Sequence, residues 1–390
     1  MLSQKFTKKI LLLFQCVAIF LILMGCSSQT PRFGVIFLYN SDIYRIPDDT
    51  QGKVEQLTFT PTIREYGLLV SKNGDRIVFD TDFYAGLEME PSELAIEELR
   101  HIYLLDTASK KLIDITNVLE DEFAQIGPNF FRDWSPDQKQ FMLIAYKGGG
   151  YEIESYLEFV DFDGKNRKDV FIPITGEIPS LIATAKWSPD AKKVMLTQVV
   201  IGSTQQWENP GSPILIYGIE NGKLTQLTDR KDGCGPVEWS PNNQKIVAIC
   251  SYIPPRGAEG ISGSATIRIL DVENPGQPYE HIGFSACSDP SWSRDGTHLA
   301  FVCDKDKECK GLFVVNSNGN GIHEVKLGNL GNPAVLKNPT WSPDGTQIVY
   351  IAGSNHEHTN IYAIHLDSSN NSPLTNQDAF YNIVAVYPAP

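Results

Sequence analysis

Short apolar runs separated by polar turn segments recur along most of this chain. Many of them come in pairs, and a polar segment of variable length separates the two members of each pair. The first members are 141–145, 194–197, 246–249, 299–302 and 348–351, and the second members are 157–160, 214–217, 267–270, 312–315 and 361–364. Short runs rich in Val, Ile and Leu that end at Gly, Asn or Asp are typical of strands. The pattern therefore predicts an all-β chain.

A short phrase precedes each pair of runs. It reads Trp134-Ser-Pro-Asp, Trp187-Ser-Pro-Asp, Trp239-Ser-Pro-Asn, Trp292-Ser-Arg-Asp-Gly and Trp341-Ser-Pro-Asp-Gly, and a degenerate copy begins at Val70. A fixed period of about 50 residues indicates a repeat architecture. Each repeat supplies four antiparallel strands, called A to D from the phrase onward. Four-stranded sheets arranged radially form a β-propeller, in which each sheet is a blade.

The phrase has a structural explanation. Pro presets φ for the first position of a turn, and Asp with Gly supplies turn chemistry, so the segment closes the hairpin from strand A to strand B. The preceding indole is expected to pack between neighbouring blades, where a Trp side chain buries about 150–250 Å². The equivalent carboxylates Asp137, Asp190, Asp295 and Asp344 are therefore interpreted as turn residues and not as a catalytic set.

The number of blades follows from the two ends of the repeat region. Six copies of the A–B phrase are present, and the apolar run at 35–39 precedes all of them without a strand A of its own. The run at 382–388 lies where the next strand A would fall. If the two ends share one blade, the propeller has seven blades; if the first strands pack elsewhere, it has six. We favour seven.

These repeats resemble those of the TolB-type β-propellers. The resemblance rests on the Trp-Ser-Pro-Asp-Gly phrase at 341–345, on Ile-Tyr-Ala-Ile at 361–364 and on Pro-Leu-Thr at 373–375. Similar repeats form the propeller of the prolyl oligopeptidases. The resemblance implies a single propeller over residues 33–390. It implies little about activity, because one fold carries many functions.

The N-terminus resembles the signal of a bacterial lipoprotein. Three Lys residues precede an apolar stretch from Ile10 to Met24, and Leu23-Met24-Gly25-Cys26 follows the order of a lipoprotein cleavage box. The resemblance implies a signal peptide at 1–25, lipidation of Cys26, and a polar tether at 26–32 that holds the propeller outside the cytoplasm. The alternative is an uncleaved membrane anchor.

The charge of the chain disfavours nucleic acid as a partner. The formal net charge is −14, and residues 1–25 hold three Lys and no acid, so the remainder is more negative still. Such a body repels phosphate backbones.

Four of the seven cysteines follow the repeat. Cys234 and Cys287 lie five positions before their Trp residues, and Cys250 and Cys303 lie eleven positions after them. These positions face each other across strands A and B, within disulfide reach. We predict Cys234–Cys250 and Cys287–Cys303. A Cys303–Cys309 bridge is the competing possibility, and no metal site is expected at these cysteines.

The candidate binding residues come from the irregular B–C connections, which emerge on one face of the ring. Exposed aromatic residues on such loops are typical of protein or glycan contact. Trp207, Tyr84, Tyr151 and Tyr252 are the candidates. We therefore predict a non-catalytic module that binds a protein, peptide or glycan through its B–C loops, without a cofactor.

An enzyme is the alternative function. A glycan-processing hydrolase or lyase would need two carboxylates a few ångströms apart at the central channel. The loop acids that qualify for this role are Glu88, Glu90, Glu152 and Glu208. No nucleophile elbow or phosphate-binding loop is recognisable in the sequence.

Overall fold

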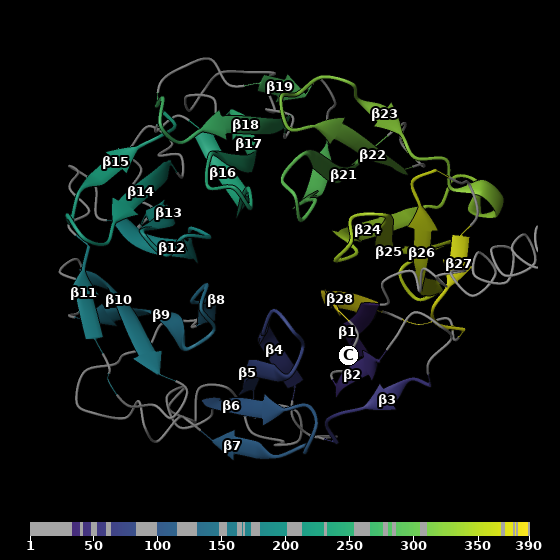
Figure 1. The fold of residues 1–390 in the computed structure, drawn as a ribbon, viewed down its shortest axis with the longest axis horizontal. Coiled ribbons are helices and arrows are strands. Elements are labelled where there is room, and N and C mark those ends of the chain that lie inside the picture. The colour runs from purple at the N-terminus through teal and green to yellow at the C-terminus, as the bar shows by residue number, and fades with distance from the viewer. Residues whose placement is uncertain are drawn as a thin grey trace, which may run out of the picture.

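The chain forms seven four-stranded antiparallel blades around a central axis (Figure 1). The first strand of each blade, strand A, lies nearest the axis, and strands B, C and D follow outward. The computed structural model describes residues 33–39, 42–47, 53–59, 64–82, 100–114, 131–147, 154–161, 166, 168–172, 180–200, 213–229, 232–252, 266–275, 280–282, 286–304, 310–367, 371–376, 379 and 381–388. The expected signal peptide at 1–25, Cys26 and the tether at 26–32 lie outside these residues.

Strands A and B form the inner half of each blade. From blade 1 to blade 7, the A strands are β28 (Tyr381–Pro388), β4 (Arg64–Val70), β8 (Phe131–Trp134), β12 (Ser180–Trp187), β16 (Asp232–Trp239), β20 (Cys287–Trp292) and β24 (Val335–Trp341). In the same order, the B strands are β1 (Phe33–Tyr39), β5 (Arg76–Asp82), β9 (Gln140–Lys147), β13 (Lys193–Val200), β17 (Lys245–Tyr252), β21 (His298–Asp304) and β25 (Gln347–Gly353).

The outer half of each blade has shorter strands. The C strands are β2 (Asp42–Ile46), β6 (Arg100–Asp106), β10 (Glu154–Asp161), β14 (Ile214–Gly218), β18 (Thr266–Asp271), β22 (Lys310–Asn316) and β26 (Thr359–His365). The D strands are β3 (Glu55–Gln56), β7 (Leu112–Asp114), β11 (Lys168–Phe171), β15 (Leu224–Gln226), β19 (Glu280–Ile282), β23 (His323–Glu324) and β27 (Asn371–Pro373). A short 3-10 helix at Gly328–Leu330 joins blades 6 and 7, and no helix among the described residues has the length and apolar character that a membrane crossing needs.

Blade 1 joins the two ends of the propeller. Strand β28 pairs with β1 from Phe33↔Pro388 to Tyr39↔Tyr381, and β2 and β3 complete the sheet. The prediction of seven blades with a shared terminal blade is therefore confirmed, and the six-blade alternative is wrong. The hydrogen bonds of this pair connect the first described strand directly to the last, so they close the ring.

The A–B turns repeat one hydrogen-bonding pattern. In blade 3, the Ser135 hydroxyl donates to the Asp137 carboxylate at 2.7 Å and accepts from the Gln140 backbone N–H at 2.9 Å. The Gln138 backbone N–H donates back to the Ser135 carbonyl. Blades 4, 6 and 7 repeat the Ser-to-Asp bond, and blade 5 uses Asn242 in place of Asp. The turn carboxylates therefore form hydrogen bonds within the turns in which they lie.

The repeat Trp side chains lie between neighbouring blades. Trp134 packs against Val78 and Leu104 of blade 2, and Trp341 packs against Ala300 and Val314 of blade 6. Trp239 and Trp292 occupy the corresponding places in blades 5 and 6 and are also buried, while Trp187 is half-buried against Phe159. Each of these blades thus presents an indole to the blade before it.

The four cysteines of blades 5 and 6 lie in pairs. Cys234 faces Cys250 across β16 and β17, and Cys287 faces Cys303 across β20 and β21. Each pair is joined as a disulfide with a Cα–Cα separation of 4.1 Å. These are the pairs that the repeat spacing predicts; Cys309, the competing partner, lies outside the described residues.

Candidate functional site: the A–B mouth of the channel

The A–B turns surround one opening of the central channel, which we call the A–B mouth. Blade 1 has no A–B turn, and its A and B strands instead bring Pro388 and Phe33 to this end of the ring. The Tyr387 ring lies against Gly34 in blade 1 and against Gly74 in the first A–B turn. The place where the propeller begins is therefore part of the A–B mouth.

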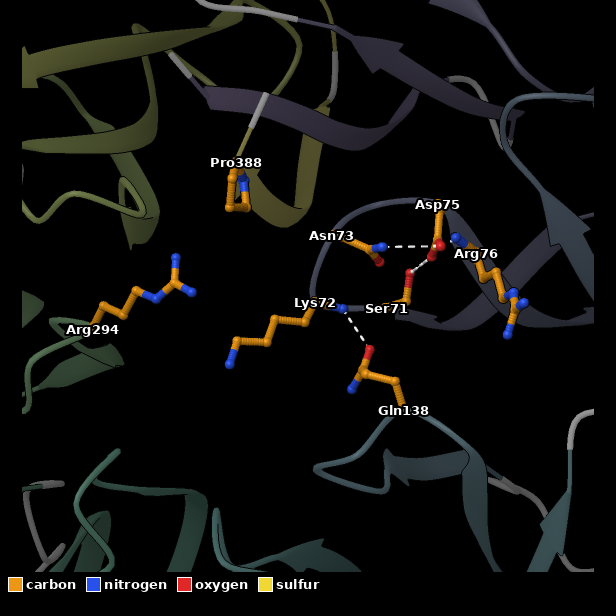
Figure 2. A pocket seen from close by; sticks show the side chains of 8 residues that line it. All are labelled: Ser71, Lys72, Asn73, Asp75, Arg76, Gln138, Arg294 and Pro388. Atoms are coloured by element: carbon orange, nitrogen blue, oxygen red, sulfur yellow. Dashed lines mark hydrogen bonds between the residues drawn. The ribbon is translucent and has the colours of Figure 1, made fainter. Parts of the chain in front are cut away.

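A cavity of about 350 Å³ lies at the A–B mouth (Figure 2). Residues from four different blades line it. They are Ser71, Lys72, Asn73, Asp75 and Arg76 from blade 2, Gln138 from blade 3, Arg294 from blade 6 and Pro388 from blade 1. Figure 2 shows the side chains of Lys72 and Arg294 extending into the same open space from different sides.

Lys72 and Arg294 occupy equivalent positions of the repeat. Each is the second residue after the Trp position, Val70 in blade 2 and Trp292 in blade 6, and the other four phrases have Pro there. The turns are nevertheless alike, because the Gly74 and Gly296 N–H groups donate to the Ser71 and Ser293 carbonyls as in the Pro-containing turns. Replacing Pro at a turn position whose backbone suits it lowers the free energy of unfolding by about 0.4–1 kcal/mol. Two repeats therefore carry a cation where the turn itself favours Pro.

Lys72 and Arg294 form no ion pair within the described part of the chain. No salt bridge there joins either side chain to a carboxylate. Asp295, beside Arg294, accepts hydrogen bonds from the Ser293 hydroxyl and from Thr297, and these bonds hold the pKa of Asp295 below its ordinary value. Asp75 likewise accepts from the Ser71 hydroxyl at 2.6 Å and from the Asn73 amide at 3.0 Å. Both carboxylates therefore already accept hydrogen bonds from groups in their own turns.

Gln138 links two A–B turns beneath the cavity. Its side-chain oxygen accepts a hydrogen bond from the Lys72 backbone N–H at 2.6 Å, and its amide nitrogen donates to the Ser135 carbonyl at 3.1 Å. The backbone of Lys72 is therefore held by the neighbouring blade, while its side chain extends into the cavity.

Three ionisable residues lie deeper, on the innermost strands of blades 3 to 5. Asp133, Lys186 and Glu238 each come directly before a repeat Trp. Burial raises the pKa of Asp133 to about 6 and that of Glu238 to about 7, and Lys186 opposes both shifts. Asp133 accepts from the backbone N–H groups of Trp134 and Trp187, and Glu238 accepts from that of Trp292. These carboxylates join neighbouring blades, and this structural role accounts for their position.

Most residues of the predicted binding face lie outside the described part of the chain. This holds for Trp207, Tyr84 and Tyr151, and for the loop acids Glu88, Glu90, Glu152 and Glu208. Tyr252 is described only as the last backbone position of β17, paired with Asp232. The aromatic B–C face therefore stays a prediction. Within the described residues, no group of three His, Cys, Asp or Glu side chains is placed to hold a metal ion.

Sequence reasoning missed the A–B mouth although a signal was present. The phrases at Val70 and Trp292 depart from the others by having Lys72 and Arg294 in place of Pro. A departure that replaces a favourable turn residue with a cation in two repeats indicates a function. That both cations line one cavity follows only from the ring geometry.

The fold and part of the sequence match known proteins. The model of the TolB beta propeller domain family matches residues 140–382. No curated protein matches the chain.

Similar solved structures include a prolyl endopeptidase, at 13% identity and a TM-score of 0.59 over 90% of this chain. The match covers 50% of the endopeptidase, so this chain spans about half the length of that protein. An oligogalacturonate lyase in complex with manganese matches at 14% identity and a TM-score of 0.54, over 83% of this chain and 82% of the lyase. The propeller domain of the Trilobed protease from Pyrococcus furiosus, described as having an open velcro topology, matches at 11% identity and a TM-score of 0.53, over 88% and 94% of the two chains. At these identities the likeness concerns the fold alone.

Proposed function

Because this chain belongs to the TolB β-propeller domain family, we propose that it is a non-catalytic binding module tethered to a bacterial membrane. In this proposal, Cys26 carries the lipid, the propeller lies outside the cytoplasm, and the B–C loops bind a protein, peptide or glycan partner. The candidate contact residues are Trp207, Tyr84, Tyr151 and Tyr252.

The position of Phe33 carries this proposal. The propeller begins at the A–B mouth, where Phe33 pairs with Pro388. A tether of seven residues, 26–32, extends at most about 25 Å. A lipid on Cys26 would therefore keep the A–B mouth close to the membrane. The B strands end at the opposite end of the blades, so in this proposal the B–C connections face away from the membrane.

Two further features support the location and the binding role. The Cys234–Cys250 and Cys287–Cys303 disulfides suit an oxidising compartment outside the cytoplasm. The channel carboxylates Asp133 and Glu238 already accept backbone hydrogen bonds between blades. A hydrolase or lyase would have to draw its acids from elsewhere in the chain.

The test is affinity capture of the full lipidated protein from native membranes. The expected result is a partner that is lost in Trp207→Ala and retained in Phe171→Ala, a control that removes an aromatic side chain, 46% exposed, from the outer strand β11. Equal partner recovery from the two variants, or no enriched partner, would contradict binding at the B–C face.

The mass of the native membrane protein tests the tether separately. A lipoprotein should give a chain that begins at Cys26 and carries added lipid. A chain that retains residues 1–25 without added lipid would instead support the uncleaved anchor.

A further inference from the structure

We propose that Lys72 and Arg294 form a phosphate-binding site across the A–B mouth of the channel. The site lies at the opposite end of the ring from the B–C loops, so it is distinct from the partner-binding face. It does not depend on the tether or on the partner.

The arrangement of donors matches a phosphate group. The Arg294 guanidinium is a planar fork that pairs with two phosphate oxygens, and the Lys72 ammonium adds a compact second charge. Both side chains line the same cavity, and the Asp75 carboxylate in its lining already accepts hydrogen bonds from the Ser71 hydroxyl and the Asn73 amide. The nearly dianionic charge of a phosphate monoester matches the two cations, which form no ion pair with any residue that the structure describes.

The repeat provides an internal comparison for these two residues. Pro136, Pro189, Pro241 and Pro343 hold the equivalent position in the other four phrases, and their turns form the same backbone hydrogen bond. Lys72 and Arg294 are therefore not needed for the turn conformation. Lys72 lies in blade 2 and Arg294 in blade 6, three blades apart around the seven-blade ring. Both can line one cavity only when the ring is complete.

The size of the cavity admits more than a bare phosphate ion. A volume of about 350 Å³ corresponds to about twelve water molecules at the volume each occupies in the liquid. A phosphate with a glycerol-sized substituent therefore fits at the A–B mouth.

Two sources offer this chemistry at the A–B mouth. One is a soluble phosphate monoester. The other is the phosphate monoester of a lipid headgroup such as that of phosphatidic acid, which the proposed tether would hold near the mouth at a high effective concentration. The second source is consistent with an acidic body, because tethering offsets weak attraction to an anionic surface.

The first experiment measures the binding of glycerol 3-phosphate by calorimetry at constant ionic strength. It uses the full mature chain with Cys26→Ser, so that no lipid is attached. We expect saturable binding that weakens about 10- to 100-fold in Arg294→Pro and in Lys72→Gln and disappears in the double variant. Arg294→Pro restores the common repeat phrase, so this variant should be at least as stable to heat as the parent.

Lys192→Gln is the matched control. Lys192 is exposed on the A–B turn of blade 4 and does not line the cavity. This variant changes the net charge by the same amount and should leave phosphate binding unchanged. Absence of saturable binding, or equal weakening in Lys192→Gln and Arg294→Pro, would overturn the proposal.

The second experiment distinguishes the two sources. A water-soluble short-chain phosphatidic acid, whose headgroup is a phosphate monoester, is titrated into the same unlipidated chain and compared with short-chain phosphatidylcholine. Binding of the phosphatidic acid that is tighter than that of glycerol 3-phosphate and is lost in the Lys72→Gln, Arg294→Pro double variant would assign a lipid headgroup. Binding of glycerol 3-phosphate without binding of the short-chain lipid would uphold the phosphate site and assign a soluble ligand. Loss of both would reject the site, whether or not the Trp207 experiment finds a partner.

Discussion

The carboxylate of Asp133 in blade 3 accepts a hydrogen bond from the backbone N–H of Trp187 in blade 4, at 2.9 Å. Glu238 of blade 5 forms the same kind of bond with the backbone N–H of Trp292 in blade 6. In both cases the residue before one repeat Trp reaches the backbone of the next repeat Trp. These bonds connect the innermost strands of neighbouring blades.

The raised pKa values of these acids predict a pH-dependent stability. Burial raises the pKa of Glu238 to about 7 and that of Asp133 to about 6, whereas both titrate near their ordinary values when unfolded. A raised folded-state pKa contributes stability that is present below the unfolded pKa and is lost as the pH rises through the folded pKa. The free energy of unfolding should therefore decrease between pH 5 and pH 8.

Glu238→Gln tests this directly. The amide keeps an oxygen acceptor for the Trp292 N–H and cannot ionise, so the decrease between pH 5 and pH 8 should become smaller. Urea unfolding at pH 5, 6.5 and 8 measures the effect. The exposed Glu220→Gln serves as a control that should keep the parent profile. Parallel pH profiles for Glu238→Gln and the parent would contradict the assignment.

Below about pH 4 the opposite trend should appear. Hydrogen bonds from Ser135 and Ser293 are the largest causes that lower the pKa values of Asp137 and Asp295, and Ser188 and Ser342 help to lower those of Asp190 and Asp344. These turn acids contribute stability above their unfolded pKa that is lost as the pH falls. The same urea series, extended to pH 3, should show maximum stability at mildly acidic pH. A continuous rise in stability down to pH 3 would contradict this role of the turn carboxylates.

Trp341 and Trp292 form a matched pair for the energetics of the indole N–H. Both are 5% exposed. Trp341 Nε1 donates to the Ser291 carbonyl at 3.0 Å, whereas the buried Trp292 Nε1 has no acceptor among the described residues. Replacement by Phe removes similar apolar area from both sites. It breaks a hydrogen bond only at Trp341 and removes an unsatisfied donor at Trp292.

Trp341→Phe should therefore destabilise the protein by about 1–2 kcal/mol more than Trp292→Phe. Chemical denaturation of the two variants measures the difference. Equal losses would indicate that the Ser291 bond adds nothing beyond packing.

The sequence was sufficient for the architecture because its signals are local and repeated. The Trp-Ser-Pro-Asp phrase marks each A–B hairpin, and the unpaired runs at 35–39 and 382–388 predict the shared blade.

The sequence does not predict in which direction the side chain before each Trp points. The A–B pairing carries a register shift in each of blades 2 to 7, as between Phe131 and Asp133 or between Cys234 and Val237. A bulge changes which face a residue presents, so strand alternation does not predict the contacts of Asp133 or Glu238.

The disulfides should contribute measurably to stability. Each closes a loop with a sequence separation of 16, for which chain entropy predicts about 3 kcal/mol. Cys250→Ala and Cys303→Ala should each lower the free energy of unfolding by an amount of this order. Denaturation under non-reducing conditions measures the loss.

Thiol counting distinguishes the two pairings of Cys303. In unlipidated protein with Cys26→Ser, Cys309→Ala should leave no free thiol if Cys287 and Cys303 are joined. Two free thiols in that variant, those of Cys287 and Cys303, would favour the Cys303–Cys309 bridge.

Closure of the ring depends on the fit of Tyr387 against Gly34. Tyr387 is 5% exposed, and a Cβ at Gly34 would overlap its ring. Gly34→Ala should therefore displace Tyr387 from the β28–β1 junction and destabilise the protein by about 1–3 kcal/mol. In a Tyr387→Ala background the same change meets no ring and should cost much less, so the two substitutions should be strongly non-additive. Gly235→Ala, where a Cβ meets nothing within 4 Å, is the control for loss of a glycine. Additive losses in a double-mutant cycle measured by urea unfolding would show that Tyr387 and Gly34 do not act together in closing the ring.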